Sequence, residues 1–300
     1  MGRWVFETGD ARELLIDLLD AQVCKLPDGR LLHVTLGEGF IPTPRLRLSV
    51  NGVMHELVTT HASVLERHYS RPRHQDIYSQ PDPWIEAFHQ ARIRQCRRLL
   101  HGVRGRVCDI GSGFSLVRNA GPWPFALSTC DRDAEAVAVL RDAGVDAVEA
   151  PADDPPFQPH SFDAVYAGEI VEHLVEPAHA LRRWVDLVRP GGRLVITTPN
   201  RRHLLTRVRG YELVENPEHL FEWDVDEMRA AVTAAGARIM HSEGLMLPLP
   251  VYVPGRGWRD AFGAAARRIG APQPLLIRAV ELGRPLPALA MNIAVVARAS

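Results

Sequence analysis

The sequence predicts an α/β fold: a doubly wound, Rossmann-like and mostly parallel seven-stranded sheet, preceded by a β-rich appendage. Three observations predict this fold. From Gly105 onward, short apolar runs alternate with helical patterns, which is the order of elements in a parallel sheet covered by helices on both faces. The first run ends at a glycine turn, Gly111-Ser112-Gly113, and ligands of such sheets bind where the strands end. A Pro- and Gly-rich segment, residues 244–288, precedes the last strand as a lid-like insertion.

The 300-residue chain is 46% hydrophobic and 24% charged, which is ordinary for a globular protein with one large domain and an appendage. Its formal net charge of −1 gives no overall field toward polyanions, so nucleic acid is disfavoured as a partner without being excluded. The chain has no apolar run of about 18 residues and no N-terminal apolar segment, so we expect no membrane association. The cysteines form no CxxC pair, which favours a reducing cytoplasm and argues against a zinc cluster. They are Cys24, Cys96, Cys108 and Cys130.

Residues 1–80 differ in texture from the rest and are expected to form the small β-rich appendage. A short helical stretch is predicted at residues 11–20. Asp28-Gly29 and Asn51-Gly52 are hairpin-turn signals. Three short strands are expected around these turns, at residues 31–36, 45–50 and 56–60.

Residues 81–300 are expected to form the main domain, opened by a helix with Asp82 as N-cap and Pro83 at its first position. Its strands are predicted at residues 106–110, 124–130, 145–149, 162–167, 193–198, 237–243 and 291–298. Helices are predicted at residues 133–143, 177–189 and 225–235. The last of these has Asp224 and Glu227 in capping-box spacing. The insertion at 244–288 is expected to contain two short helices.

The glycine turn and the following strand predict a nucleoside site. Glycines let a ligand approach bare backbone, and Asp131, about 20 residues on, can hold ribose hydroxyls. A dinucleotide site needs a third small residue for close packing, and Leu116 stands there instead. A nicotinamide oxidoreductase is therefore a disfavoured alternative, and a P-loop is absent because no GKS or GKT follows.

Three motifs resemble those of the class I S-adenosylmethionine-dependent methyltransferases. Asp109-Ile110-Gly111-Ser112-Gly113 resembles their motif I. Pro155-Pro156-Phe157, followed by Ser161-Phe162-Asp163-Ala164-Val165, is similar to the motif around their fourth strand. Arg189-Pro190-Gly191-Gly192-Arg193-Leu194 is similar to their turn before the fifth strand. The resemblance covers about residues 83–243 and the closing strand.

This resemblance implies S-adenosylmethionine as cofactor and gives roles to individual residues. Gly111 and Gly113 would let the methionine part of the cofactor lie on the backbone, and Asp131 would bind the ribose. Asp153 or Asp154 would lie near the adenine amino group, although Pro151 stands where the family often has an acid. The implied cofactor-binding residues are Asp109, Gly111, Ser112, Gly113, Asp131, Arg132, Asp153, Asp154 and Glu169.

Glu169, Glu172 and His173 stand at i, i+3 and i+4, so they share one face if this stretch is helical. With His219 they offer two carboxylates and two imidazoles, a set that suits Mn²⁺, Co²⁺ or Fe²⁺ better than Ca²⁺. The segments 169–174 and 219–223 resemble the metal motif of bacterial small-RNA 2′-O-methyltransferases. Similar residues occur without metal in small-molecule methyltransferases, so both alternatives stand.

His173 is the candidate general base, because its intrinsic pKa is suitable and a nearby carboxylate such as Glu169 could hold its tautomer. The alternative is a histidine buried in the cofactor wall. Two arginine clusters, at 92–98 and 201–209, could contact phosphates, although charge runs are usually solvated. The apolar residues within 246–258 suit a lid over a small acceptor, and a homodimer contact would use the same residues.

The sequence therefore predicts a cytoplasmic S-adenosylmethionine-dependent methyltransferase. The expected acceptor is an oxygen or nitrogen of a small metabolite, such as a sugar or natural-product intermediate. One alternative is a metal-assisted RNA 2′-O-methyltransferase. Another is a noncatalytic scaffold that retains the cofactor fold.

Overall fold

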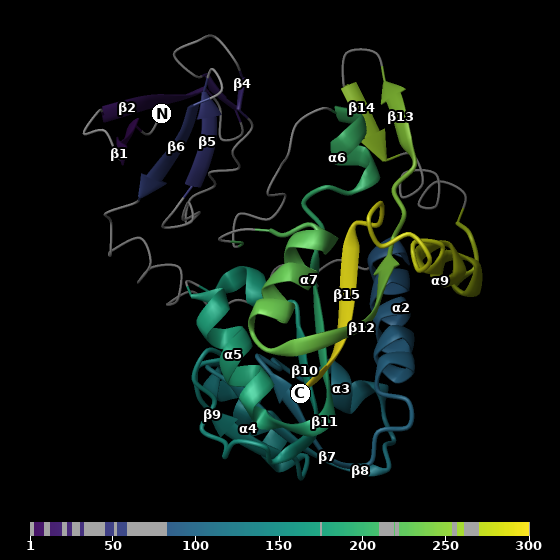
Figure 1. Cartoon of the computed structure of the whole chain (residues 1–300). Helices are drawn as coiled ribbons and strands as arrows, with labels where there is room; N and C mark the ends of the chain where they lie inside the picture. Colours follow the sequence, from purple (N-terminus) through teal and green to yellow (C-terminus); the bar gives the residue numbers. More distant parts are fainter. Residues whose placement is uncertain are drawn as a thin grey trace. The chain divides into compact units, whose positions relative to one another are not determined.

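The structure is a computed structural model of the chain (Figure 1). It describes the backbone of six strands between residues 3 and 58, and then residues 83–174, 176–209, 219, 222–253, 257–260 and 270–299. The chain divides into two compact units. The first comprises Met1–Gln80 with Arg209–Glu222, and the second comprises Pro81–Val208 with Trp223–Ser300.

The first unit contains a six-stranded sheet in the order β4-β3-β2-β1-β6-β5, with every neighbouring pair antiparallel. Val50 pairs with Val53, so the two strands that Asn51-Gly52 was expected to join do form a hairpin, although these two residues lie outside the described ones. Asp28-Gly29 also lies outside them. The strands are β1 (Arg3–Thr8), β2 (Glu13–Leu19), β3 (Val23–Lys25), β4 (Leu31–Leu32), β5 (Leu46–Val50) and β6 (Val53–Val58).

The helix predicted at residues 11–20 is wrong, because this stretch forms strand β2. Its leucines have good helical propensity, yet Glu13–Leu19 pairs antiparallel with β1 in a register that sets Arg3 opposite Asp17. Cross-strand pairing with a neighbouring segment has overridden the local preference, as it commonly does for short apolar runs.

The second unit contains a seven-stranded sheet in the order β12-β15-β11-β10-β7-β8-β9. The five neighbouring strands β11, β10, β7, β8 and β9 pair in parallel, and β15 is antiparallel to both β11 and β12. This confirms the mostly parallel, doubly wound sheet. Strand order reverses between β7 and β10, so the ends of these strands flank the crevice in which such sheets bind ligands. The strands are β7 (Gly105–Ile110), β8 (Phe125–Asp131), β9 (Asp146–Glu149), β10 (Phe162–Gly168), β11 (Val188–Pro199), β12 (Ala237–Leu245) and β15 (Asn292–Ala299).

The predicted helices of this unit are confirmed, and both capping-box hydrogen bonds of Asp224 and Glu227 are present at the start of α7. Helix α2 begins at Pro83 as expected, while its predicted N-cap, Asp82, lies outside the described residues. The helices are α2 (Pro83–Leu99), α3 (Leu116–Ala120), α4 (Ala134–Asp142), α5 (Pro177–Leu187), α6 (Leu204–Arg209), α7 (Val225–Ala234) and α9 (Gln273–Glu281), with a 3₁₀ turn η1 (Val171–His173).

Helices cover both faces of the sheet. Leu99 and Leu100, at the end of α2, share a buried cluster with Val107 of β7, Val195 of β11 and Val296 of β15. Figure 1 shows α2 and α9 on one side of this sheet and α5 and α7 on the other. The right-handed crossovers of parallel strands require this arrangement, because the chain leaves β7 in one direction and β10 in the opposite direction. Because the strands are parallel, the polar residues that follow β7, β8, β9, β10 and β11 lie at the same edge of the sheet, where the carboxyl ends of these strands meet.

One of the two short helices predicted for the insertion at 244–288 is confirmed, and the described residues do not test the other. The described part of the insertion contains a hairpin, β13 (Pro250–Val253) with β14 (Gly257–Asp260), and the helix α9. Tyr252 pairs with Trp258 across the hairpin, and the Tyr252 side chain is 59% exposed. Valine, tyrosine and tryptophan favour strands, which accounts for the hairpin in this apolar stretch. Residues 261–269 lie outside the described ones.

In the part of the chain that the structure describes, no helix combines the length and the apolar character that crossing a bilayer requires.

Candidate functional site

The glycine turn Gly111-Ser112-Gly113, called the glycine bend below, follows β7 and is hydrogen-bonded to the neighbouring strand β8. Gly111 and Gly113 both have left-handed backbones, with φ of +60° and +49°. The amides of Gly111 and Ser112 donate to the carbonyl of Cys130 over 2.9 and 3.2 Å. A Cβ at Gly111 would lie 2.4 Å from Cγ1 of Ile170, so only glycine fits there. The bend therefore packs closely against Ile170 at the switch point of the sheet, with Gly111 half-buried and Gly113 buried.

Asp131 ends β8 and reaches back to this bend. Its Oδ2 accepts from the Gly113 amide over 2.7 Å, and its Oδ1 accepts from the Asp133 amide over 2.8 Å. Two backbone donors thus fix the orientation of the carboxylate that is expected to hold the ribose. Arg132, the next predicted residue, is exposed.

Asp109 lies beneath the bend and is 2% exposed. Its Oδ2 accepts from the hydroxyl of Ser115 over 2.7 Å, and that hydroxyl in turn accepts from the Arg118 amide, which caps α3. Burial raises the pKa of Asp109 to about 7, and the hydrogen bond from Ser115 opposes this shift. Sequence reasoning missed Ser115, although a serine just before the apolar Leu116 is an N-cap signal.

The loop after β9 carries Asp153 and Asp154, and the structure separates their environments. The indole of Trp184 donates to the carbonyl of Ala152 over 2.7 Å, which anchors this loop to α5. The Asp154 side chain is 76% exposed and lies 3.6 Å from Arg183 on that helix. Asp153 is half-buried, so it is the better of the two candidates for an adenine contact.

Glu169 follows β10 with a left-handed backbone, φ +56°. Its carboxylate accepts from Thr197 Oγ1 over 2.5 Å and from Asn292 Nδ2 over 2.8 Å. Glu169 is thus fixed by β11 and β15 at the same edge as the glycine bend. Thr197 and Asn292 were missed from sequence, because they lie 28 and 123 residues away and no local pattern marks them.

Glu172 and His173 stand on the single turn η1, just beyond Glu169. Glu172 is fully buried, and its Oε2 accepts from Thr198 Oγ1 over 3.0 Å. His173 is half-buried. The turn spans three residues and leaves Glu169 outside it, so the helical face expected for Glu169, Glu172 and His173 is limited to the last two.

His219 belongs to the first unit and is buried. Its Nδ1 lies 2.7 Å from Oε1 of Glu222, which is buried as well, so this carboxylate orients the imidazole. Glu172 and His173 belong to the second unit and His219 to the first, so the metal set expected from the sequence stays a prediction. The carboxylate of Glu169, the remaining member of the expected metal set, is bound by Thr197 and Asn292.

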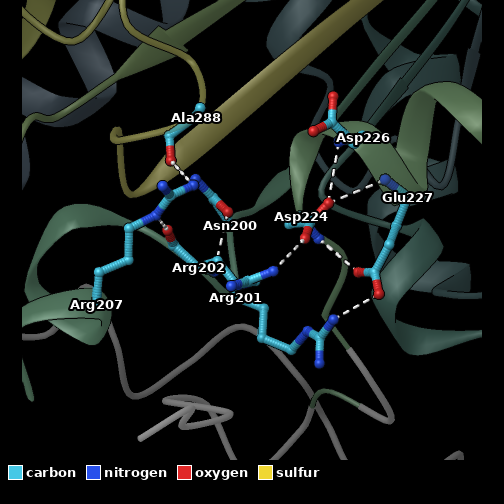
Figure 2. Close-up of polar contacts among 8 residues, drawn as sticks. All are labelled: Asn200, Arg201, Arg202, Arg207, Asp224, Asp226, Glu227 and Ala288. Carbon is cyan, nitrogen blue, oxygen red and sulfur yellow. Dashed lines mark hydrogen bonds and ion pairs between the residues drawn. The ribbon is translucent and has the colours of Figure 1, made fainter. Parts of the chain in front are cut away.

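Two of the arginines after β11 form ion pairs with the start of α7 (Figure 2). Arg201 Nη2 lies 2.5 Å from Glu227 Oε1, and Arg202 Nη1 lies 3.7 Å from Asp224 Oδ2. These acids also form the capping box of α7, so the arginines connect the segment after β11 to that helix.

Arg207 closes the same network from α6. It donates to the carbonyl of Arg202 over 2.7 Å and to that of Ala288 over 3.0 Å, while Asn200 Oδ1 accepts from the Arg202 amide (Figure 2). These contacts join α6 to the segment before β15. The arginines thus have structural partners, which weakens the expectation that they contact phosphates; the side chain of Arg209 lies outside the described ones.

Residues 108–196 match the protein family described as "Methyltransferase domain". The matched segment begins at Cys108 and contains the glycine bend, Asp131 and the stretch from Glu169 to His173. It ends at Ile196, in β11.

The chain is also similar to curated proteins over part of its length. It is 31% identical over 129 residues to the ubiquinone biosynthesis O-methyltransferase of Xanthomonas euvesicatoria pv. vesicatoria, covering 40% of this chain and 54% of that protein. It is 30% identical over 131 residues to a Mycobacterium tuberculosis protein named as an S-adenosylmethionine-dependent methyltransferase, covering 43% and 46%. The chain thus spans about half the length of the curated relatives it matches.

Among solved structures, an S-adenosylmethionine-dependent methyltransferase from Thermotoga maritima superposes with a TM-score of 0.48 at 14% identity, covering 72% of this chain and 91% of that one. Residues 108–196 are thus similar to a methyltransferase domain, and the curated relatives that this chain matches are named as methyltransferases.

Proposed function

We propose that the protein transfers a methyl group from S-adenosylmethionine to an oxygen or nitrogen of a small metabolite, such as a sugar or natural-product intermediate. One observation carries this proposal: the segment matching the methyltransferase domain contains the glycine bend, Asp131 and Glu169, which lie at one edge of the sheet. The name of the Xanthomonas relative, an O-methyltransferase of ubiquinone biosynthesis, supports an oxygen acceptor.

In this proposal the chain positions two reactants. When bound, S-adenosylmethionine supplies an electrophilic methyl group. The bare backbone at Gly111 and Gly113 accommodates its methionine part, and the prealigned carboxylate of Asp131 accepts hydrogen bonds from the ribose hydroxyls. Holding acceptor and donor in line can supply about 7–11 kcal/mol of the barrier, which is why so little covalent chemistry is required of the protein.

His173 is proposed as the base that takes the proton of an acceptor hydroxyl. It lies on η1, four residues after Glu169, whose carboxylate is held by Thr197 and Asn292. A carboxylate fixed by two donors offers a rigid charge near the reacting groups, where it stabilises the imidazolium formed on proton transfer.

A second candidate function is metal-assisted 2′-O-methylation of RNA. It is favoured by the neighbouring Glu172 and His173 on η1, since a carboxylate and an imidazole suit a borderline divalent ion. An ion held there would act as a Lewis acid on the acceptor oxygen. The pairing of Arg201 with Glu227 and of Arg202 with Asp224 speaks against a phosphate-binding surface after β11.

The cytoplasm is the proposed compartment. Cys96, Cys108 and Cys130 are free and buried, as expected where thiols stay reduced. Burial raises the pKa of the Cys130 thiol to about 12, so it is an unreactive part of the core.

The proposed function is tested by incubating the protein with S-adenosylmethionine and a panel of hydroxylated and amino metabolites, with and without Mn²⁺, and measuring S-adenosylhomocysteine by mass spectrometry. Turnover of a small acceptor without added metal supports the proposal. Turnover confined to RNA and dependent on Mn²⁺ supports the second candidate. Cofactor binding with no turnover on any acceptor points to the noncatalytic scaffold.

A further inference from the structure

A groove of about 560 Å³ opens at the end of the sheet opposite the glycine bend. Its lining comprises residues 98–99 and 101–104 before β7, Asp163 of β10, residues 189–193 of β11, Met240 and His241 of β12, and residues 296–298 of β15. Asp163 is the acidic residue of its described lining, which also includes His101 and His241. The lining also contains five arginines: Arg98, Arg104, Arg189, Arg193 and Arg298.

Arginines face one another across this end of the sheet. Arg193 of β11 pairs in register with Arg298 of β15, and Arg298 pairs in register with Arg238 of β12. Directly opposed residues project from the same face, and like charges in such positions destabilise a sheet. Val195 and Val296, each two residues from its arginine, pack in the cluster that contains α2, so these arginines lie on the face that α2 covers. Three neighbouring strands therefore present guanidinium groups side by side.

Acidic residues balance two of the five arginines in the groove. Arg98 lies 3.2 Å from Glu243 and 3.0 Å from Glu281, and Arg189 lies 2.5 Å from Asp163. These ion pairs fix the walls of the groove.

Arg104, Arg193 and Arg298 have no acidic partner among the residues that the structure describes. Arg193 donates instead to the neutral carbonyls of Leu99 and His101, over 2.5 and 3.1 Å, at the C-terminal end of α2. Burial and the Arg298 guanidinium lower the pKa of Arg193, as expected where no anion compensates the charge. Among the described residues, the groove thus holds three guanidinium groups without an acidic partner, on three separate segments.

We propose that this groove is a second binding site, for a ligand that carries two or more linked phosphate groups. The planar fork of a guanidinium matches phosphate oxygens, and Arg193 is already held in place by the end of α2. Gly102 and Gly191 are among its lining residues, with φ of +78° and +76° and no atom within 4 Å of a Cβ built there, so phosphate oxygens can approach the backbone. A volume of about 560 Å³ is in the range of small-molecule sites, and three charged groups suit linked phosphates better than a single one.

Linked phosphate groups occur both in an inorganic polyphosphate and in the diphosphate of a nucleotide, and the groove would recognise either source. Inorganic tripolyphosphate and ADP are therefore titrated separately into the full-length protein by calorimetry. Saturable binding of either probe supports the proposal, and the tighter probe identifies the source. Absence of binding by both overturns it.

Arg104→Gln/Arg298→Gln is the decisive variant. Both side chains are exposed, and removing the charge of Arg298 relieves its repulsion with Arg193. Without ligand, the double variant should therefore melt at or above the melting temperature of the wild type. Loss of charge-assisted hydrogen bonds should weaken probe binding at least about tenfold. The control is Arg229→Gln/Arg278→Gln, which removes two exposed arginines outside the groove and gives the same change in net charge.

Wild-type affinity in this control, together with the loss in Arg104→Gln/Arg298→Gln, supports a specific site. Equal weakening in both variants would mean general charge attraction and would overturn the proposal. S-adenosylhomocysteine affinity should be the same in all three proteins, because the groove lies at the other end of the strands. A loss of that affinity in Arg104→Gln/Arg298→Gln would contradict an independent site, whatever the fate of the proposed methyl transfer.

Discussion

Oδ2 of Asp131 accepts a hydrogen bond of 2.7 Å from the backbone amide of Gly113. The bond connects the end of β8 to the glycine bend after β7, which are the two segments expected to hold the ribose and the methionine part of the cofactor. The carboxylate is thus oriented before any ligand arrives, and such preorganisation lowers the entropic cost of binding.

Asp131→Asn should weaken S-adenosylhomocysteine binding at least about tenfold, because the amide keeps one acceptor oxygen and loses the charge that strengthens hydrogen bonds from ribose hydroxyls. Isothermal calorimetry measures the change. Asp142→Asn, at the exposed end of α4, is the matched control and should bind normally. Equal affinity in the Asp131 and Asp142 variants would remove the ribose assignment.

Asp109 should make stability depend on pH. Its pKa is raised from 3.8 to about 7 by burial, so between these values the folded protein keeps a proton that the unfolded chain has released. The free energy of unfolding therefore falls as pH rises through this window, by on the order of 4 kcal/mol.

Asp109→Asn lacks this titration. Urea unfolding at several pH values should show that the gap in unfolding free energy between the wild type and Asp109→Asn changes steadily from about pH 4 to about pH 7, the window set by the two pKa values. Parallel profiles would show that Asp109 is ionised throughout the window.

Gly111→Ala should destabilise the domain and abolish cofactor binding, because the new Cβ meets Ile170 in addition to the strain of a positive φ. Gly144→Ala is a control for the strain alone, since Gly144 has φ +79° and no atom within 4 Å of its Cβ position. Gly111→Ala should cost roughly 1–3 kcal/mol more than the control in chemical denaturation. Similar costs for both would mean that Ile170 moves away freely.

His173→Ala should lower turnover by roughly 10²–10⁴-fold if the imidazole is the base, with little change in cofactor affinity. The control, His179→Ala, removes an exposed imidazole from α5 and should leave turnover unchanged. Once an acceptor is known, steady-state kinetics separate kcat from KM. Near-normal kcat in His173→Ala would assign His173 to the cofactor wall.

The strands of the main sheet were predictable because each is a short apolar run bounded by turn residues, and Asp224 with Glu227 marked the start of α7 in the same local way. Strand β2 was not predictable, since its helical preference yields only to pairing with β1. The short helix α3 was also missed, although its N-cap Ser115 carried a signal.

The site was predictable where it consists of chain segments, such as the glycine bend, Asp131 and the stretch 169–173. It was not predictable where strands distant in sequence meet. The hydrogen bonds of Thr197 and Asn292 to Glu169 depend on the order of β10, β11 and β15, which the local sequence does not encode.

We propose that a sulfonium nucleoside binds across the glycine bend with its ribose on Asp131. This is measured by calorimetric titration of the full-length protein with S-adenosylmethionine, S-adenosylhomocysteine and NAD⁺. Saturable binding is expected for the first two compounds and none for the third. Binding of NAD⁺ with no heat from either adenosyl compound would contradict it.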